Sequence, residues 1–290
     1  MRRLGLLLLL LPAPALAHAG ESHGGWTLSP WVTGPLLVSA LLYATGLARL
    51  WRRSDQGRPA LRRAAFLFAS GWLILAAALV SPLLEAGEAS FAMHMIEHEL
   101  IMLPAALLLV ASRPGAAMLW ALPAPARWAL GGVARSGKGL WRWLTDPLAA
   151  TLLQLAAMWV WHAPALFDRA LANDGWHIAQ HLSFLVTALL FWWAMMHGRA
   201  GNYGLSAFCL FVTSVAGGAL GVLMAVSQSP WYSGYAAMGL TPTGLTPAED
   251  QQLAGAIMWV PAGAFHGAAA LYFLWKWLKA SEANHVLAAE

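Results

Sequence analysis

The chain has 290 residues, of which 59% are hydrophobic and 10% are charged, and its formal net charge is +4 at pH 7. Soluble domains carry about 25% charged residues, so this composition excludes a soluble globular protein and predicts an all-α integral membrane protein. The Lys and Arg residues are confined to particular connections and are not clustered on one soluble face, which excludes nucleic acid as a partner and leaves the lipid bilayer.

The N-terminal stretch has the pattern of a secretory signal peptide over residues 1–17. Two arginines precede a short apolar run, and an Ala- and Pro-rich stretch with an A-x-A cleavage site follows. Cleavage after Ala17 would make His18 the first residue of a periplasmic tail, residues 18–30, that also contains His23. A free amine beside the His18 imidazole is a chelating pair for copper. An uncleaved anchor or a disordered tail is the alternative interpretation.

Seven apolar stretches follow, each close to the roughly 20 residues that a helix needs to cross the hydrocarbon core. They predict a seven-helix transmembrane domain over residues 31–280 and a cytoplasmic tail over residues 281–290. His162 and Pro164 break the fourth stretch, so its outer boundary is the least defined. The stretches are Trp31–Trp51, Ala64–Leu84, Phe91–Val110, Leu148–Phe167, His177–Met196, Tyr203–Ser227 and Leu253–Leu278.

The distribution of charge between the connections predicts the orientation. Lys and Arg are retained on the cytoplasmic side, and they concentrate in the first, third and fifth connections and after the last stretch. The alternate connections carry mostly Asp and Glu, with Arg169 as their basic residue. The N-terminus is therefore expected outside and the C-terminus in the cytoplasm, which agrees with a signal peptide and with the inner membrane of a bacterium.

With this topology, five of the ten histidines converge on the outer side of the membrane. His94 and His98 lie in the outer third of the third stretch, His162 lies at the outer end of the fourth, and His177 and His181 begin the fifth. Histidines at positions i and i+4 lie on one helical face with Cβ atoms about 5 to 6 Å apart, so both imidazoles can reach one metal ion. The sequence therefore predicts a metal site on the periplasmic side.

The donor types point to copper. Met95 and Met102 lie on the same stretch as the first histidine pair, and thioether with imidazole is a ligand set suited to Cu(I). The chain has one cysteine, Cys209, and no CxxC motif. We expect His98 and His181 to be the central ligands, with His94 and His177 above them and either methionine completing the site.

Three neighbouring residues have supporting or open roles. Glu97 would accept a proton from an imidazole or orient it, because ligands must be deprotonated and their hydrogen-bond partners fix their geometry. Pro104 should loosen the backbone hydrogen bonds below His98 and let the site adjust. His266, near the middle of the last stretch, is either a deeper binding site for the ion or a hydrogen-bond donor between packed helices.

Other interpretations of this cluster remain open. His94-Met95-Ile96-Glu97-His98 matches H-x-x-E-H, a pattern of zinc proteases, although no acidic third ligand follows on an apolar helix. Haem could be held between His98 and His181, but this would leave the i, i+4 pairing unexplained. The polar cluster could also be purely structural. An unpaired ionised side chain inside a membrane costs about 2.5 to 3.5 kcal/mol, so these side chains need partners, and they could be partners for one another.

Three segments carry a resemblance to a known family. The segments from His94 to Leu100, from Trp161 to Asp168 and from His177 to Phe184 resemble the CtaG family of caa3-type cytochrome c oxidase assembly factors. The resemblance implies a non-enzymatic role in supporting copper delivery to the haem-copper centre, with oxidase subunits and a copper donor as partners. His94, Met95, His98, His162, His177 and His181 match motif residues of the family.

Overall fold

The computed structural model describes residues 25–198 and 202–289, and within these ranges the chain is helical and contains no strand. The predicted signal peptide, His18 and His23 lie outside the described residues. Six helices are long and apolar enough to cross a membrane, and a bent pair of helices makes a seventh span if it is counted as one. The predicted all-α membrane class is therefore confirmed, and the seven predicted spans correspond to six helices and the bent pair counted as one span.

The spans agree closely with the apolar stretches of the sequence. The third consists of α4, the π-helical turn η1 and α5 in direct succession. The bent pair is α9 and α10. The bounds are α1 Pro30–Trp51, α2 Arg58–Val80, α4 Phe91–Leu100, η1 Ile101–Ala105, α5 Ala106–Ser112, α9 Pro147–Trp161, α10 Pro164–Ala172, α11 Asp174–His197, α12 Tyr203–Val226 and α14 Pro247–Ala289.

Two of the predicted stretches do not form single helices, and on this point the prediction was wrong. The second ends at Val80, and Leu84 belongs to a separate short helix, α3 (Pro82–Ala89), whose first residue is a proline. The fourth breaks after Trp161, and α10 leaves α9 at an angle of 73°. Pro164 has no N–H to continue the ladder of α9, but it is well suited to start a helix, so the break falls at this proline.

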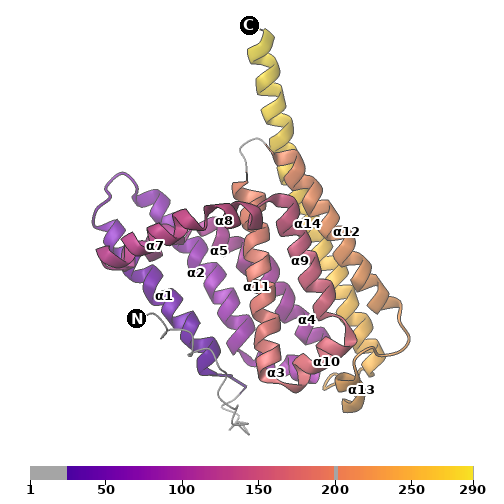
Figure 1. The fold of residues 1–290 in the computed structure, drawn as a ribbon. Helices are drawn as coiled ribbons and strands as arrows, with labels where there is room; N and C mark the ends of the chain where they lie inside the picture. The colour runs from indigo at the N-terminus through magenta and orange to yellow at the C-terminus, as the bar shows by residue number, and fades with distance from the viewer. Residues whose placement is uncertain (1–24, 199–201, 290) are drawn as a thin grey trace, which may run out of the picture.

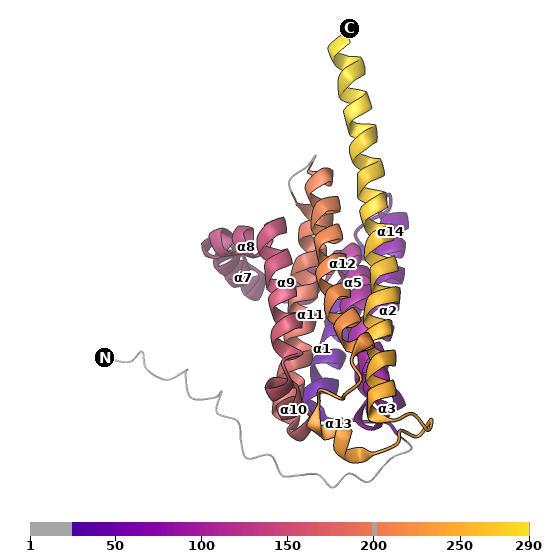
Figure 2. The same cartoon turned by 90° about the vertical axis from the view of Figure 1, so that its right-hand side faces the viewer.

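The third connection was expected to be a loop, but it is helical. It contains α6 (Gly115–Ala121), α7 (Ala124–Ser136) and α8 (Lys138–Leu144). α6 packs against α1, because Gly46 of α1 has no side chain to collide with the backbone at Ala117. α7 and α8 bury no residue and project to one side of the bundle (Figure 2).

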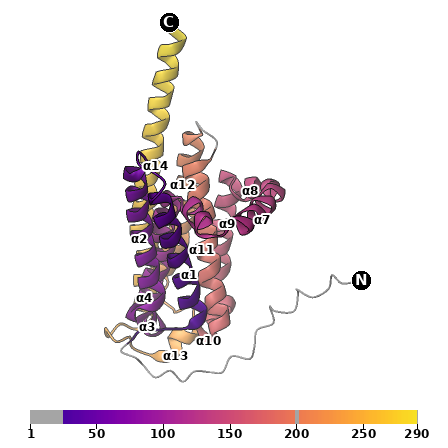
Figure 3. The ribbon, with the colours of Figure 1, turned by 90° about the vertical axis from the view of Figure 1, so that its left-hand side faces the viewer.

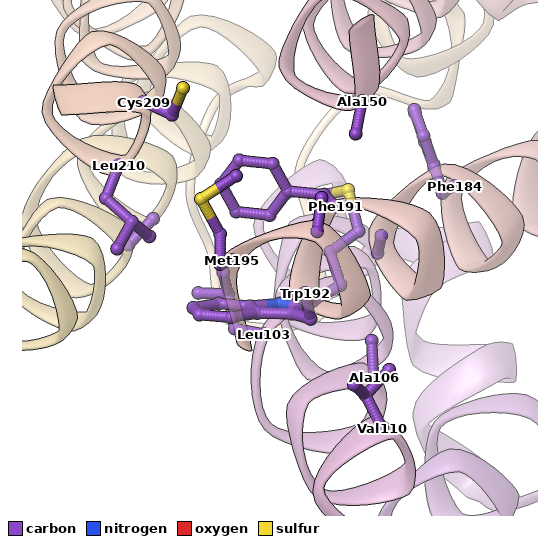
Figure 4. Packing of buried hydrophobic residues seen from close by; sticks show 14 of the residues in the cluster. Leu103, Ala106, Val110, Ala150, Phe184, Phe191, Trp192, Met195, Cys209 and Leu210 are labelled. Carbon is purple, nitrogen blue, oxygen red and sulfur yellow. Dashed lines mark hydrogen bonds between the residues drawn. The ribbon is translucent and has the colours of Figure 1, made fainter. Parts of the chain in front are cut away.

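The largest apolar cluster lies where the spans meet. It joins residues of η1, α5, α9, α11, α12 and α14 around Phe191 and Trp192, each of which is 1% exposed. Figure 4 shows Trp192 lying flat beside Leu103 and Met195. The indole Nε1 donates a hydrogen bond to the Met102 carbonyl at 2.9 Å. This core fixes α11 against the third span, the two helices that carry the histidine pairs.

The Met102 carbonyl is available to Trp192 because the backbone ladder changes at this point. Pro104 lacks an N–H, and the chain forms the π-helical turn Ile101–Ala105, in which the Ala106 N–H is directed to the carbonyls of Ile101 and Leu103. The structure confirms that Pro104 perturbs the helix directly below His98. Such wide turns are frequent at functional sites.

The start of α4 is capped by a residue that is distant in the sequence. Asp250 of α14 is 2% exposed, and its carboxylate accepts hydrogen bonds from the Ser90 hydroxyl at 2.8 Å and from the Phe91 N–H at 2.6 Å. A negative charge at a helix N-terminus is favourable, since the first N–H groups of a helix have no partner within it. Asp250 thus fixes the end of α4 that leads into the first histidine pair.

We expect Asp250→Asn to lower stability by about 2 kcal/mol, because it removes a charge-assisted cap from a buried helix start. The thermal unfolding midpoint of the protein in detergent measures the effect. Asp55→Asn is the matched control, since its carboxylate is 95% exposed and pairs only with Arg58. Equal midpoints for both variants would contradict the role of Asp250 as a structural cap.

Three short helices gather at one end of the bundle (Figures 1 and 3). They are α3, α10 and α13 (Ser233–Met238). Asp168 of α10 accepts hydrogen bonds from the Ser233 hydroxyl at 2.6 Å and from the Gly234 N–H at 3.2 Å, which ties α10 to α13. The histidine pairs of α4 (His94 and His98) and α11 (His177 and His181) lie at this end, and α14 extends beyond the opposite end.

Candidate metal centre

Five histidines from three parts of the chain meet beneath these short helices. The ring centroids of His94 and His98 are 4.4 Å apart, and those of His177 and His181 are 4.3 Å apart. Between the helices, His98 lies 5.1 Å from His181 and His94 lies 5.3 Å from His177. His162, at the break between α9 and α10, is 6.2 Å from His98. The structure therefore brings together the five histidines that the sequence placed on one side.

The ligand atoms form two overlapping sets. One nitrogen each from His94, His98 and His181 lies within 4.8 Å of the others, and the same holds for ligand atoms of His94, Glu97 and His177. The cluster is withdrawn from solvent: Glu97 is fully buried, His98 is 1% exposed and His181 is 9% exposed. Buried polar groups need partners, so the hydrogen bonds of each ring decide what the cluster can do.

His94 is oriented by a tyrosine from α13. The Tyr235 hydroxyl donates to the Gly87 carbonyl at 2.6 Å and lies 3.1 Å from His94 Nδ1. Burial raises the pKa of Tyr235 well above its ordinary value, and the nearby carboxyl of Asp250 raises it further, so the hydroxyl keeps its proton. Because that single proton goes to Gly87, His94 must donate its Nδ1–H to the tyrosine oxygen. Nε2 of His94 then carries the lone pair.

The same arrangement recurs at His162, whereas Nδ1 of His181 has only a longer contact with a carboxylate that makes no hydrogen bond in the described residues. His162 Nδ1 lies 2.7 Å from the Met158 carbonyl, which can only accept a hydrogen bond, so the proton of His162 is on Nδ1. His181 Nδ1 lies 3.5 Å from a carboxylate oxygen of Glu97. The Nε2 atoms of His162 and His181 are buried and have no hydrogen-bond partner in the described residues. Metal-ligating histidines commonly hold their second nitrogen against an oxygen acceptor in this way.

His98 stands at the centre of the cluster. Its Nε2 lies 2.9 Å from His94 Nε2, and its Nδ1 has no partner among the described residues. Since His94 Nε2 carries a lone pair, His98 must donate its Nε2–H to it when no metal is bound. A metal ion would replace this proton, which can move to the free Nδ1 of the same ring. The ring pair is thus arranged so that a cation can take the place of a hydrogen.

The unpartnered atoms favour a ligand over a purely structural polar cluster. Glu97, His98, His162, His177 and His181 all contribute buried nitrogen or oxygen atoms without hydrogen bonds in the described part of the chain. Unsatisfied buried polar atoms are uncommon in native proteins and often mark a site for an ion or water. Imidazole nitrogens suit zinc, copper, iron and nickel, so the donor set fits a transition metal.

The two methionines of the prediction are placed differently. Met95 is fully buried in an apolar cluster with Phe91, Phe167 and Met158. Met102 lies one turn below His98, and its sulfur accepts a hydrogen bond from Gln154 Nε2 at 3.4 Å. Their part in binding an ion stays a prediction.

The cluster is covered by aromatic residues that the sequence pattern did not indicate. Phe167 of α10 is fully buried, and its ring lies 5.3 Å from His94 and 4.2 Å from Tyr232. The Tyr232 hydroxyl donates to the His162 carbonyl at 3.0 Å. Tyr235 is 141 positions from His94, so spacing along the chain gives no sign of their contact.

Acidic side chains lie beside the cover. Burial raises the pKa of Glu88 in α3, and the carboxyls of Asp174 and Glu85 raise it further. These three carboxyls therefore interact at the histidine end of the bundle. A group of negative charges at the mouth of a site raises the local concentration of cations.

The short distance between His98 and His181 argues against haem bound between them. Two axial ligands must stand on opposite faces of a porphyrin, but the rings of His98 and His181 pack directly against each other, with centroids 5.1 Å apart. Haem between them would require α4 and α11 to separate.

Comparison with known proteins places the chain in a family. The model of the cytochrome c oxidase caa3 assembly factor family, Caa3_CtaG, matches residues 41–280. The chain belongs to this family. The match includes every helix that carries a histidine of the cluster, so the site lies within the part that the family shares. The resemblance seen in the sequence is confirmed.

Two curated relatives are similar over most of the chain. The uncharacterized proteins Mb0105 of Mycobacterium bovis and MT0111 of Mycobacterium tuberculosis are each 28% identical to it over 265 residues. The alignments cover 81% of this chain and 36% of each relative, so the chain spans about a third of their length. No solved structure matches the chain.

Proposed function

We propose that this assembly factor binds copper at the histidine cluster and supports its delivery to the haem-copper centre of cytochrome c oxidase. His98 and His181 act as central ligands, and His94, His177 and His162 complete the donor set. Glu97 orients His181. The chain works as a binding protein for the ion and not as an enzyme.

One observation carries this proposal. His94 and His162 each hold Nδ1 at hydrogen-bond distance from an oxygen atom, and the buried Nε2 atoms of His162 and His181 have no partner in the described residues. Neutral imidazoles with free lone pairs are metal ligands. A haem-copper oxidase needs copper inserted during its assembly, which links such a cluster to the role of the family.

The charge distribution supports a periplasmic site in the bacterial inner membrane. The helices at the histidine end carry Glu85, Glu88 and Asp168, whereas Arg49 and Arg53 lie at the ends of spans on the other side. Basic residues are retained on the cytoplasmic side. Oxidase subunits and a copper donor would then meet the protein on its periplasmic face.

Anaerobic loading of the detergent-purified protein tests the proposal. Cu(I) and Zn(II) are added separately, excess metal is removed, and the retained metal is measured. We expect stable retention of Cu(I). Retention of zinc alone would favour the zinc-hydrolase interpretation of the H-x-x-E-H motif, and retention of neither would move the function to scaffolding of oxidase subunits.

Tyr235→Phe should weaken Cu(I) binding by about 10- to 100-fold, as loss of a ligand's hydrogen-bond partner commonly does. The variant keeps the ring but frees His94 Nδ1, so the imidazole can rotate or change tautomer. Competition with a Cu(I) chelator measures the affinity. Tyr272→Phe is the control, because Tyr272 is 49% exposed on α14. An unchanged affinity in Tyr235→Phe would show that His94 does not depend on the tyrosine.

A further inference from the structure

A second group of donors lies around a small cavity inside the bundle. The cavity has about 30 Å³ of free space and lies between the third span, α9, α12 and α14. This volume is enough for one or two water molecules or a metal ion. The side chains that matter here are Glu99, Met102, Gln154, Met158, Met258 and His266, all of which line it.

The cavity lining is rich in soft donors. Three thioethers, from Met102, Met158 and Met258, line one space. Gly217 of α12 lies beside one of them, since a Cβ at this position would be in ordinary contact with the Met158 sulfur at 3.6 Å. Methionine is a common gap-filler, but three methionines around a space that they do not fill suggest a ligand.

His266 adds an imidazole whose tautomer is fixed. Its Nδ1 lies 2.9 Å from the Ala262 carbonyl, so Nδ1 carries the proton and Nε2 has a free lone pair. The residue is 9% exposed and lines the cavity. Its second nitrogen is thus held as in a ligating histidine.

Glu99 supplies an oxygen in need of a partner. One of its carboxylate oxygens is buried and has no hydrogen bond in the described residues, and the same is true of the Gln154 carbonyl oxygen. A monovalent cation would offset a Glu99 carboxylate and leave the site neutral. Neutrality matters because an uncompensated charge inside a membrane is costly.

Two helices connect the cavity to the histidine cluster. Met102 follows His98 by four residues on the third span, and Met158 precedes His162 by four residues at the end of α9. Four residues of helix rise about 6 Å, so on each helix a histidine of the upper cluster stands one turn from a methionine of the cavity. The π-helical turn begins immediately before Met102.

We propose that this cavity is a second Cu(I) site, with Met158, Met258 and His266 as ligands, Met102 between the two sites, and Glu99 balancing the charge. The proposal shares with the proposed function only the identity of the ion, because its ligands Met158, Met258 and His266 are not ligands of the histidine cluster. Thioether and imidazole donors favour Cu(I), whereas Mg²⁺ and Ca²⁺ take their ligands from oxygen.

X-ray absorption of the full chain loaded anaerobically with Cu(I) alone tests the second site. We expect a sulfur shell around copper in the wild type. The double variant Met158→Leu/Met258→Leu should lose this shell together with one equivalent of Cu(I) and keep nitrogen ligation, since Leu conserves volume. Met238→Leu is the matched control, because Met238 is 55% exposed.

The two copper proposals fail in distinguishable ways. If the cavity binds Cu(I) and the histidine cluster does not, the wild type binds one equivalent with a sulfur shell, His181→Ala keeps all of it and the double methionine variant loses all of it; this result would support the cavity and overturn the histidine site. Nitrogen ligation without sulfur in the wild type, or a sulfur shell that the double variant retains, would overturn the cavity. Met158→Leu alone, at an unchanged unfolding midpoint, repeats the test if the double variant does not fold.

Discussion

His98→Ala and His181→Ala are each expected to lose Cu(I) at the histidine cluster and to prevent maturation of the oxidase. The ring of His98 contacts three other histidines of the cluster and Phe184, and His181 lies beside Glu97. Removing either ring breaks the set of His94, His98 and His181, and the other set holds two imidazoles and a carboxylate oxygen of Glu97 without either central ligand. Retained copper after anaerobic loading, measured together with oxidase activity in cells, gives the result.

The matched control for this pair is His197→Ala. His197 lies at the opposite end of α11 and contacts Arg113, so the change removes the same side chain from the same helix without touching the cluster. The amount of each variant in the membrane is measured as well. Equal amounts would show that the copper is lost because the site is changed and not because the protein is missing. If either cluster variant kept full copper binding at the nitrogen site, the ligand assignment would be wrong.

Gly255→Val should have the largest effect on the fold. A Cβ at Gly255 of α14 would collide with the Gly221 carbonyl of α12, and a Cβ at Gly221 would lie 2.7 Å from the Gly255 carbonyl. The two backbones are therefore in direct contact, as is common where membrane helices pack through small residues. We expect a loss of about 3 kcal/mol, because neither backbone can move away from the other without opening the bundle.

The thermal unfolding midpoint of the variant measures this loss, and Gly267→Val is its control on the same helix. A Cβ at Gly267 would meet nothing within 4 Å, so the same substitution is expected to be tolerated there. A similar drop in both variants would show that valine disturbs α14 itself and not its contact with α12. The cavity lies between the same two helices, so Gly255→Val should also release any ion held there.

Much of this arrangement follows from local sequence. Hydropathy indicates the spans because the bilayer imposes a minimum length on each apolar helix. The alternating topology then places His94, His98, His177 and His181 on one side. The break of the fourth span at Pro164 was visible as an interruption, but its 73° angle was not, because packing of α10 over the cluster sets the direction.

The parts that sequence could not supply are long-range contacts. Asp250 and Tyr235 lie in the last third of the chain, yet they cap α4 and orient His94. Neither residue belongs to a motif, and an acidic residue near a helix start is ordinarily a local cap. The sequence also did not predict the helices α6, α7 and α8 of the third connection. This segment is rich in small and basic residues and lacks an apolar stretch long enough to be recognised as a span.

The tie between Asp168 and the start of α13 has a kinetic consequence. In the proposed function, a bound ion would lie beneath Phe167 and Tyr235, and separation of α10 and α13 would uncover it. Residence time would then depend on the rate of that opening and not on the strength of the coordinate bonds. Movements of such covering segments take microseconds to milliseconds. A client protein that contacts these two short helices would therefore decide when its cargo is released.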